Sequence, residues 1–188
     1  MILNLIDKNH AKILLFLAVS PGSRYSRKEI KEKTGMNNVP LDNSLNALIN
    51  LKLINEENKI YSLNLENEIV QQLMKEKRKI FNLPLKVQFI LLDFIDYALN
   101  LKSINRIILF GSSSKLIFSE KSDIDIAVIF ADKIKNREKA EKKISAFEDK
   151  LSKKYRKEIQ SHFFLEKDLE RKEDTLIRDI LRNGIFLI

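Results

Sequence analysis

Two aspartates two positions apart, Asp123 and Asp125, open a hydrophobic stretch in the second half of the chain. In a β-strand, side chains two residues apart point to the same face, so the two carboxylates should project together. Two adjacent carboxylates repel each other unless a cation lies between them. Mg²⁺ or Mn²⁺ suits carboxylate oxygens and also binds phosphate oxygens. The pair therefore indicates a divalent-metal site facing a phosphate-bearing ligand.

A glycine and a serine, Gly111 and Ser112, directly follow another hydrophobic stretch, residues 106–110. Glycine lets the backbone approach a phosphate closely. A serine at the start of a helix offers its hydroxyl and backbone amides to an anion, and Lys115 could meet a phosphate as a point charge. Either motif alone also fits an ordinary capped turn or loop. Their conjunction with the aspartate pair favours a functional site.

The order of a hydrophobic strand, Gly-Ser and then Asp-x-Asp resembles the DNA polymerase beta superfamily of nucleotidyltransferases. The resemblance rests on Gly111, Ser112, Asp123 and Asp125 and covers residues 103–188. It implies a minimal nucleotidyltransferase-like domain that binds a metal-bound nucleoside triphosphate, with ATP as the expected one. The implied reaction transfers the nucleotidyl group to a hydroxyl of a protein or RNA acceptor, and pyrophosphate leaves.

One departure from the family motif concerns the phosphate-binding turn. The family usually shows Gly-Ser-x-Ala-Arg-Gly, whereas the last three positions here are Ser114, Lys115 and Leu116. Lysine lacks the bidentate fork of arginine, so Lys115 should contact phosphate less specifically. Leucine lacks the backbone freedom of glycine, so the turn should also differ in shape.

A second departure concerns the third carboxylate, which the family places on a later strand, here expected at residues 158–164. Alternation puts Glu158, Gln160 and His162 on one face, and an isolated histidine on a strand is more often structural than catalytic. The position equivalent to the third carboxylate is Gln160, with Glu158 as the alternative. An amide cannot act as the base for the acceptor hydroxyl. The chain is therefore interpreted either as an enzyme with a relocated base or as a nucleotide-binding relic.

Strands and helices that alternate along residues 103–188 must position these side chains. Such alternation predicts an α/β or α+β layer with a mixed sheet and flanking helices. The strands are expected at residues 106–110, 124–130 and 158–164. The helices are expected at residues 136–154 and 173–183, the second ended by Gly184 and followed by an apolar tail, 185–188. Together with the N-terminal half, this predicts an α+β protein.

The first 64 residues show another order of elements. Helices are expected at residues 9–19, 26–34 and 41–51, with a Ser26-x-x-Glu29 capping box opening the second one, and residues 37–40 are interpreted as a turn. A hairpin should follow, with strands at 52–54 and 59–63 and its turn at 56–58. Three helices closed by a hairpin resemble a winged helix-turn-helix domain over residues 1–64.

The winged-helix resemblance implies DNA binding or a protein-contact role. The expected recognition helix exposes Asn43 and Asn46 but holds no lysine or arginine, and asparagine can read adenine edges. Cations that could contact phosphates precede it at Arg24, Arg27 and Lys28. The alternative function is thus a DNA-binding regulator whose C-terminal domain senses nucleotide or dimerises.

A helical connector is expected between the two domains, over residues 65–102. Two helices at 66–82 and 85–101 flank Pro84, which is tolerated at the first turn of the second helix. They could pack on either half of the chain or on a second copy, which would give a homodimer.

Composition sets the remaining limits. The chain has 188 residues and a net charge of +8, spread along its length, which favours anionic partners only weakly. It has no cysteine, so disulfides and thiolate zinc sites are excluded. Its longest apolar run, residues 13–19, is too short to span a membrane. We therefore expect no membrane partner and a cytoplasmic location.

Overall fold

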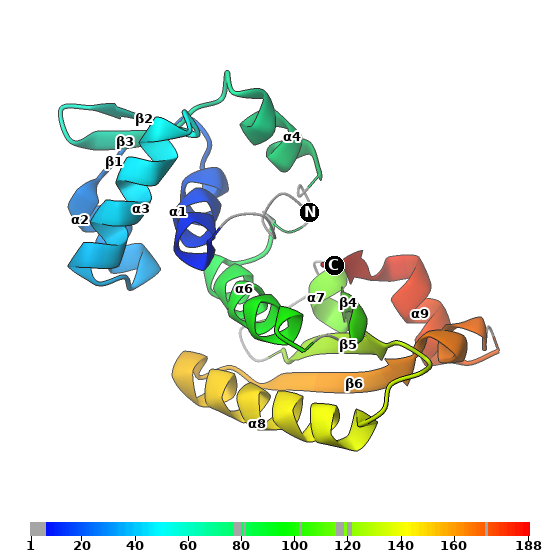
Figure 1. Cartoon of the computed structure of the whole chain (residues 1–188). Coiled ribbons are helices and arrows are strands. Elements are labelled where there is room, and N and C mark those ends of the chain that lie inside the picture. Colours follow the sequence, from blue (N-terminus) through cyan, green and yellow to red (C-terminus); the bar gives the residue numbers. More distant parts are fainter. Residues whose placement is uncertain are drawn as a thin grey trace. The chain divides into compact units, whose positions relative to one another are not determined.

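The computed structural model describes residues 7–76, 80, 82–101, 103–115, 119, 122–171 and 173–188. The chain forms two compact units, Met1–Leu92 and Asp93–Ile188, which are treated separately below (Figure 1). The division lies within helix α6 (Leu85–Leu99), inside the segment interpreted from sequence as a connector. Both units combine helices with a sheet, so the predicted α+β class is confirmed. Each helix in the described part of the chain is too short or too polar to cross a membrane.

The first unit begins with three helices and a hairpin. Its sheet is antiparallel with strand order β1-β3-β2. The predicted capping box is present, because Glu29 N–H donates to Ser26 Oγ at 3.3 Å and Ser26 N–H donates to Glu29 Oε2 at 2.7 Å. The elements are α1 (Lys8–Val19), β1 (Tyr25–Ser26), α2 (Arg27–Thr34), α3 (Asn38–Asn50), β2 (Ile54–Glu57), β3 (Ile60–Leu63) and α4 (Glu68–Glu76).

Two local expectations for this unit were wrong. The turn predicted at residues 37–40 is the first turn of α3, where Pro40 removes no intrahelical hydrogen bond. The hairpin turn predicted at 56–58 lies at Asn58 and Lys59, which both have positive φ, 52° and 62°. This geometry matches the right-handed twist of the flanking strands. Both glutamates of the expected tip therefore belong to strand β2.

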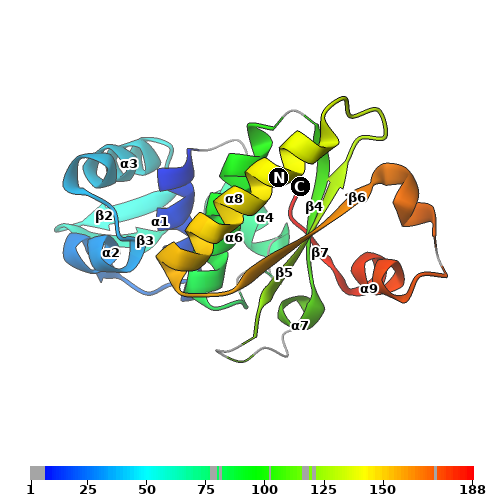
Figure 2. The same ribbon diagram turned by 90° about the horizontal axis from the view of Figure 1, so that it is seen from below.

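The second unit is built on a four-stranded mixed sheet with order β6-β5-β4-β7 (Figure 2). Strand β5 pairs antiparallel with β4 and parallel with β6, which confirms the predicted mixed sheet. The apolar tail was not assigned to a strand, but its start forms β7 along the edge of β4. The elements are the end of α6, β4 (Ile104–Phe110), α7 (Gly111–Ser114), β5 (Ile124–Phe130), α8 (Arg137–Tyr155), β6 (Ile159–Leu165), the 3-10 helix η2 (Glu166–Glu170), α9 (Thr175–Asn183) and β7 (Ile185–Phe186).

Helices cover both faces of this sheet. Helix α8 lies along one face, and α7 and α9 lie on the other side (Figure 1). On the α9 face, Ala127 and Ile129 are fully buried in a cluster with Ile177 and Ile180. Asp125 belongs to this same face by alternation. The Asp125 carboxylate therefore lies at the end of the apolar cluster beneath α9, and not on an open polar face.

A buried polar contact joins the middle of α6 to the C-terminal end of α8. The Asp93 side chain is 2% exposed and accepts hydrogen bonds from Lys154 Nζ at 2.6 Å and Tyr155 Oη at 2.7 Å. Nearby, Tyr97 and Phe147 stack with their ring centroids 4.0 Å apart. A buried carboxylate is costly unless it is paired and hydrogen-bonded. The Tyr155 hydroxyl should therefore contribute measurably to stability.

We expect Tyr155→Phe to lower the free energy of unfolding by about 1.5–3 kcal/mol, the usual contribution of a hydrogen bond to a charged group. Burial and the Asp93 carboxylate both raise the pKa of Tyr155. Wild-type stability should therefore fall as the pH rises above about 10, where the unfolded tyrosine ionises first. Urea unfolding of the whole chain measures both effects. Tyr97→Phe is the matched control, because its hydroxyl makes only a 3.4 Å contact with the Lys143 carbonyl. An equal loss in both variants would contradict the assignment.

Candidate functional site

Asp125 lies in β5, one of the two inner strands of the mixed sheet, between strands β4 and β6. Its backbone pairs with Phe110, the last residue of β4, and with Gln160 near the start of β6. Gly111 follows Phe110 and opens α7. The sheet thus brings the Gly-Ser turn, the second aspartate and the third strand to one place, although they are distant in sequence.

Gly111 and the Asp125 carboxylate are in very close approach. Gly111 has φ +69°, in the left-handed region that favours glycine. A Cβ added to Gly111 would overlap Asp125 Oδ2 and lie 3.1 Å from its Cγ. Only glycine therefore leaves room for the carboxylate in this position. From the sequence, Gly111 was expected to let a phosphate approach the backbone. The structure adds a second reason for glycine, which is the space that the Asp125 carboxylate occupies.

We expect Gly111→Ala to displace the Asp125 side chain and to destabilise the protein. Left-handed backbone costs a non-glycine residue roughly 1–2 kcal/mol, and the clash with the carboxylate adds to this cost. Gly35→Ala is the matched control, because Gly35 has φ +66° and nothing within 4 Å of the added Cβ. Chemical unfolding and ATP titration of both variants check the prediction. If the two variants lose equal stability and bind ATP alike, the contact with Asp125 is unimportant.

The surroundings of Asp125 shift the pKa of its carboxyl group above the ordinary value. Burial raises the pKa of Asp125, the Asp123 charge raises it further, and His162 opposes this effect. Asp123 is half-buried just before β5, and its carbonyl accepts a 3.5 Å hydrogen bond from Ser113 Oγ. Two carboxylates that influence each other in a partly buried place create a local excess of negative charge. A bound cation would relieve this repulsion.

The third strand presents an amide, not a carboxylate, beside Asp125. Gln160 is in register with Asp125, whereas Glu158 lies two residues earlier, and its backbone carbonyl accepts a hydrogen bond from Ile124 N–H at 3.0 Å. Both side chains are exposed. His162 is in register with Ala127, and its ring meets Phe110 edge-on at 5.1 Å. Among the described residues, no three His, Cys, Asp or Glu side chains are grouped to hold a metal ion.

Lys115 is held by helix α9, for which the sequence alone predicted no role in the site. Its Nζ lies 2.8 Å from Asp179 Oδ1, and Asn183 Nδ2 donates to the same oxygen at 2.7 Å. The hydrogen bond from Lys115 is the largest cause of a lowered Asp179 pKa. The only sequence signal was Asp and Asn four residues apart on one helix. Leu116, which departs from the family motif, lies outside the described residues.

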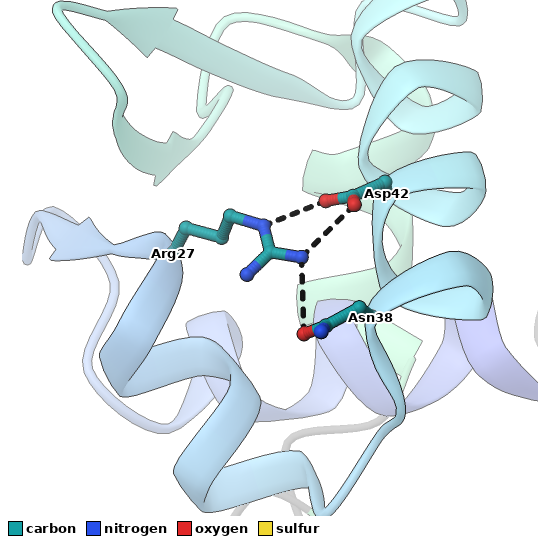
Figure 3. A network of polar contacts seen from close by, with 3 residues as sticks. All are labelled: Arg27, Asn38 and Asp42. Carbon is teal, nitrogen blue, oxygen red and sulfur yellow. Dashed lines mark hydrogen bonds and ion pairs between the residues drawn. The ribbon is translucent and has the colours of Figure 1, made fainter.

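The cations expected to contact DNA are engaged within the first unit. Arg27 forms a two-point ion pair with Asp42, at 2.6 and 2.9 Å, and also reaches Asn38 (Figure 3). Arg24 pairs with Glu57 at 2.5 Å. The remaining DNA-contact candidates, Lys28, Asn43 and Asn46, are exposed. Of these, Lys28 forms a long ion pair, with its Nζ 4.0 Å from Glu32 Oε1.

The similarity to a known protein family lies in the second unit. The family model "Polymerase beta, Nucleotidyltransferase" matches residues 93–188, slightly more than half of the chain. A crystal structure from Sulfolobus solfataricus, provisionally named a nucleotidyltransferase, is 14% identical and covers 50% of this chain and 72% of its own. Its TM-score of 0.31 is too low to support an argument. No curated protein matched the chain. On the family match, the chain belongs to the polymerase beta nucleotidyltransferase family.

Proposed function

We propose that the second unit binds a nucleoside triphosphate, with ATP as the expected one, through a divalent metal ion and transfers its nucleotidyl group slowly to a hydroxyl. The family match supports nucleotidyl transfer as the reaction class. The observation that carries the finer proposal is the register of Phe110, Asp125 and Gln160 across three adjacent strands, with Gly111 directly after Phe110. It combines the family's phosphate turn and one of its carboxylates with an amide in the third position.

The acidic pair fits one divalent ion. Asp123 and Asp125 supply carboxylate oxygens, the donors that Mg²⁺ and Mn²⁺ prefer. The raised Asp125 pKa reflects burial and the Asp123 charge, and both effects would be offset by a cation. When bound, the ion would neutralise charge on the triphosphate and on the leaving pyrophosphate. Its other ligands would come from phosphate oxygens and water.

Three groups of this chain are proposed to bind the phosphates. The Gly111 backbone and the Ser112 hydroxyl lie at the turn that ends β4. Lys115 follows at the end of α7, where Asp179 pairs with its ammonium group. An ammonium group has three N–H donors, so two donors remain for phosphate oxygens. Asp179 and Asn183 would thereby restrict where the lysine charge can lie.

Strand β6 places no carboxylate in register with Asp125 that could accept the proton of the acceptor hydroxyl. Gln160 can orient a hydroxyl by hydrogen bonding, but an amide does not accept a proton at neutral pH. We therefore infer that nucleotide binding exceeds transfer. In the limiting case there is no transfer at all, and the C-terminal unit is a nucleotide-binding relic that senses nucleotide without turnover.

Two measurements on the whole protein test the proposal. Calorimetry should show ATP binding that strengthens when Mg²⁺ is added. Incubation with Mg²⁺, labelled nucleoside triphosphates and a panel of protein and RNA acceptors should show slow labelling. Binding without labelling would support the relic. Absence of ATP binding at any Mg²⁺ concentration would rule out both versions.

We further propose that residues 1–64 form a winged helix-turn-helix domain. Three helices, the β1-β3-β2 sheet and a tight hairpin support this assignment. DNA binding is the runner-up function for the chain, but the ion pairs of Arg24 and Arg27 leave fewer cations for phosphates. A DNA complex that forms through this domain should be weak and strongly salt-dependent. A tight, salt-resistant complex would favour the DNA-binding regulator instead.

A further inference from the structure

A basic recess lies at the end of the second unit away from Asp125. Its volume is about 400 Å³, and it is formed by the turn before β4, the turn after β5 and the first part of α8. Asp125 pairs with the opposite end of β4, so the recess is separate from the proposed nucleotide site. The polar residues that line it are Asn100, Ser103, Lys135, Asn136, Lys139 and Lys143.

The three lysines of the recess have exposed side chains that form no ion pair with any described residue. The first two acidic residues of α8 are already neutralised by other cations. Glu138 pairs with Lys142 at 2.9 Å, and Glu141 pairs with Arg137 at 2.5 Å. The described lining itself contains no carboxylate. The recess therefore carries an uncompensated positive charge.

The spacing of the lysines points to an extended anion. Lys139 and Lys143 are one helical turn apart, about 6 Å along the axis. Lys135 precedes Lys139 by four residues. A row of charges fits successive phosphates better than one phosphate group. The amide and hydroxyl groups of Asn100, Ser103 and Asn136 can also donate to phosphate oxygens. The described lining has no aromatic ring, so it offers no platform for stacking unpaired bases.

We propose that this recess binds the phosphate backbone of a nucleic acid, independently of base sequence and of the nucleotide site. An RNA duplex and a DNA duplex share this backbone chemistry. Each contacted phosphate releases counterions, so the logarithm of the binding constant should fall with the logarithm of salt concentration by about 0.9 per contact. Contacts from Lys139 and Lys143 should therefore contribute about 1.8 to the slope.

The test compares two double variants of the full chain, measured without ATP or Mg²⁺. Lys139→Ala/Lys143→Ala removes two charges from the recess, and Lys150→Ala/Lys153→Ala removes two exposed charges from the same helix outside it. Binding of short, fluorescently labelled RNA and DNA duplexes is titrated from about 50 to about 200 mM salt. The recess variant should bind at least about tenfold more weakly at low salt, with a slope smaller by about 1.8. The control should change both quantities much less.

Several outcomes would overturn the proposal. Equal losses in the two variants would mean that only net charge matters, and unchanged binding in the recess variant would place the contact elsewhere. Failure of wild type to bind either duplex would also overturn it. Tighter binding of polyglutamate, lost in the recess variant, would indicate an acidic protein as the partner. A selective loss of binding to only one of the two duplexes would support the proposal and identify the nucleic acid.

Discussion

Asp125→Asn is expected to abolish the Mg²⁺-dependent part of ATP binding and to leave the fold intact. Asparagine keeps the size and shape of the side chain that lies against Gly111, so the close packing between these two residues need not change. It removes the charge that we assign to the metal ion. Calorimetric titration of ATP with and without Mg²⁺ checks this directly. Wild type should respond to Mg²⁺, and the variant should not.

The same substitution should raise stability slightly at neutral pH. The folded-state pKa of Asp125 lies above its ordinary value of 3.8, chiefly because of burial. The folded chain therefore binds this proton more tightly than the unfolded chain, and stability falls as the pH rises from the ordinary value through the folded-state pKa. Asparagine stays neutral and avoids that loss. The gain should stay below about 1 kcal/mol, because solvent screens a partly exposed group.

Asp149→Asn provides the control, since it removes one exposed carboxylate from α8 outside the site. It should leave the Mg²⁺ response of ATP binding unchanged. If Asp125→Asn retained wild-type ATP affinity with the same Mg²⁺ response, the metal assignment would be wrong. A lowered stability at neutral pH would instead contradict the electrostatic argument alone. The two parts of the prediction can therefore fail separately.

Features set by local sequence were predictable. The hydrophobic stretch at 106–110 coincides with the end of β4, and the stretch at 124–130 coincides with β5. The capping box at Ser26 also formed as expected, because both of its hydrogen bonds join residues three apart. Such elements depend on side-chain periodicity and short-range contacts. The sequence therefore located the strand that carries Asp125 and, to within one residue, the strand that carries Gln160.

Features set by distant partners were not predictable. Strand β7 is two residues long and exists because it pairs with β4, so no periodicity could reveal it. The ion pair between Lys115 and Asp179 joins helices that are distant in sequence. The contact of Gly111 with Asp125 likewise depends on the β4–β5 register. In each case, the physical cause is a tertiary neighbour that the residue's own sequence context does not contain.

Gln160→Asp is expected to give the largest gain in activity. The register places residue 160 beside Asp125, where the family resemblance implies a third carboxylate. An aspartate there could accept the proton of the acceptor hydroxyl and add a ligand for a divalent ion. General base assistance typically contributes about 10²–10⁴-fold, which sets the scale of the expected increase in transfer. The rate of label transfer at saturating Mg·ATP measures it.

Gln160→Asn is the matched control, because it shortens the side chain as aspartate does but adds no charge. It should leave the transfer rate near that of wild type, so any gain in Gln160→Asp can be assigned to the carboxylate. Glu158→Gln should also have little effect, since Glu158 lies two residues before the position that is in register with Asp125. A fast wild-type enzyme that Glu158→Gln inactivates would contradict this reasoning. In that case Glu158 would be the base, reaching the acceptor from two residues before the Asp125 register, and Gln160 would only help to orient the bound substrate.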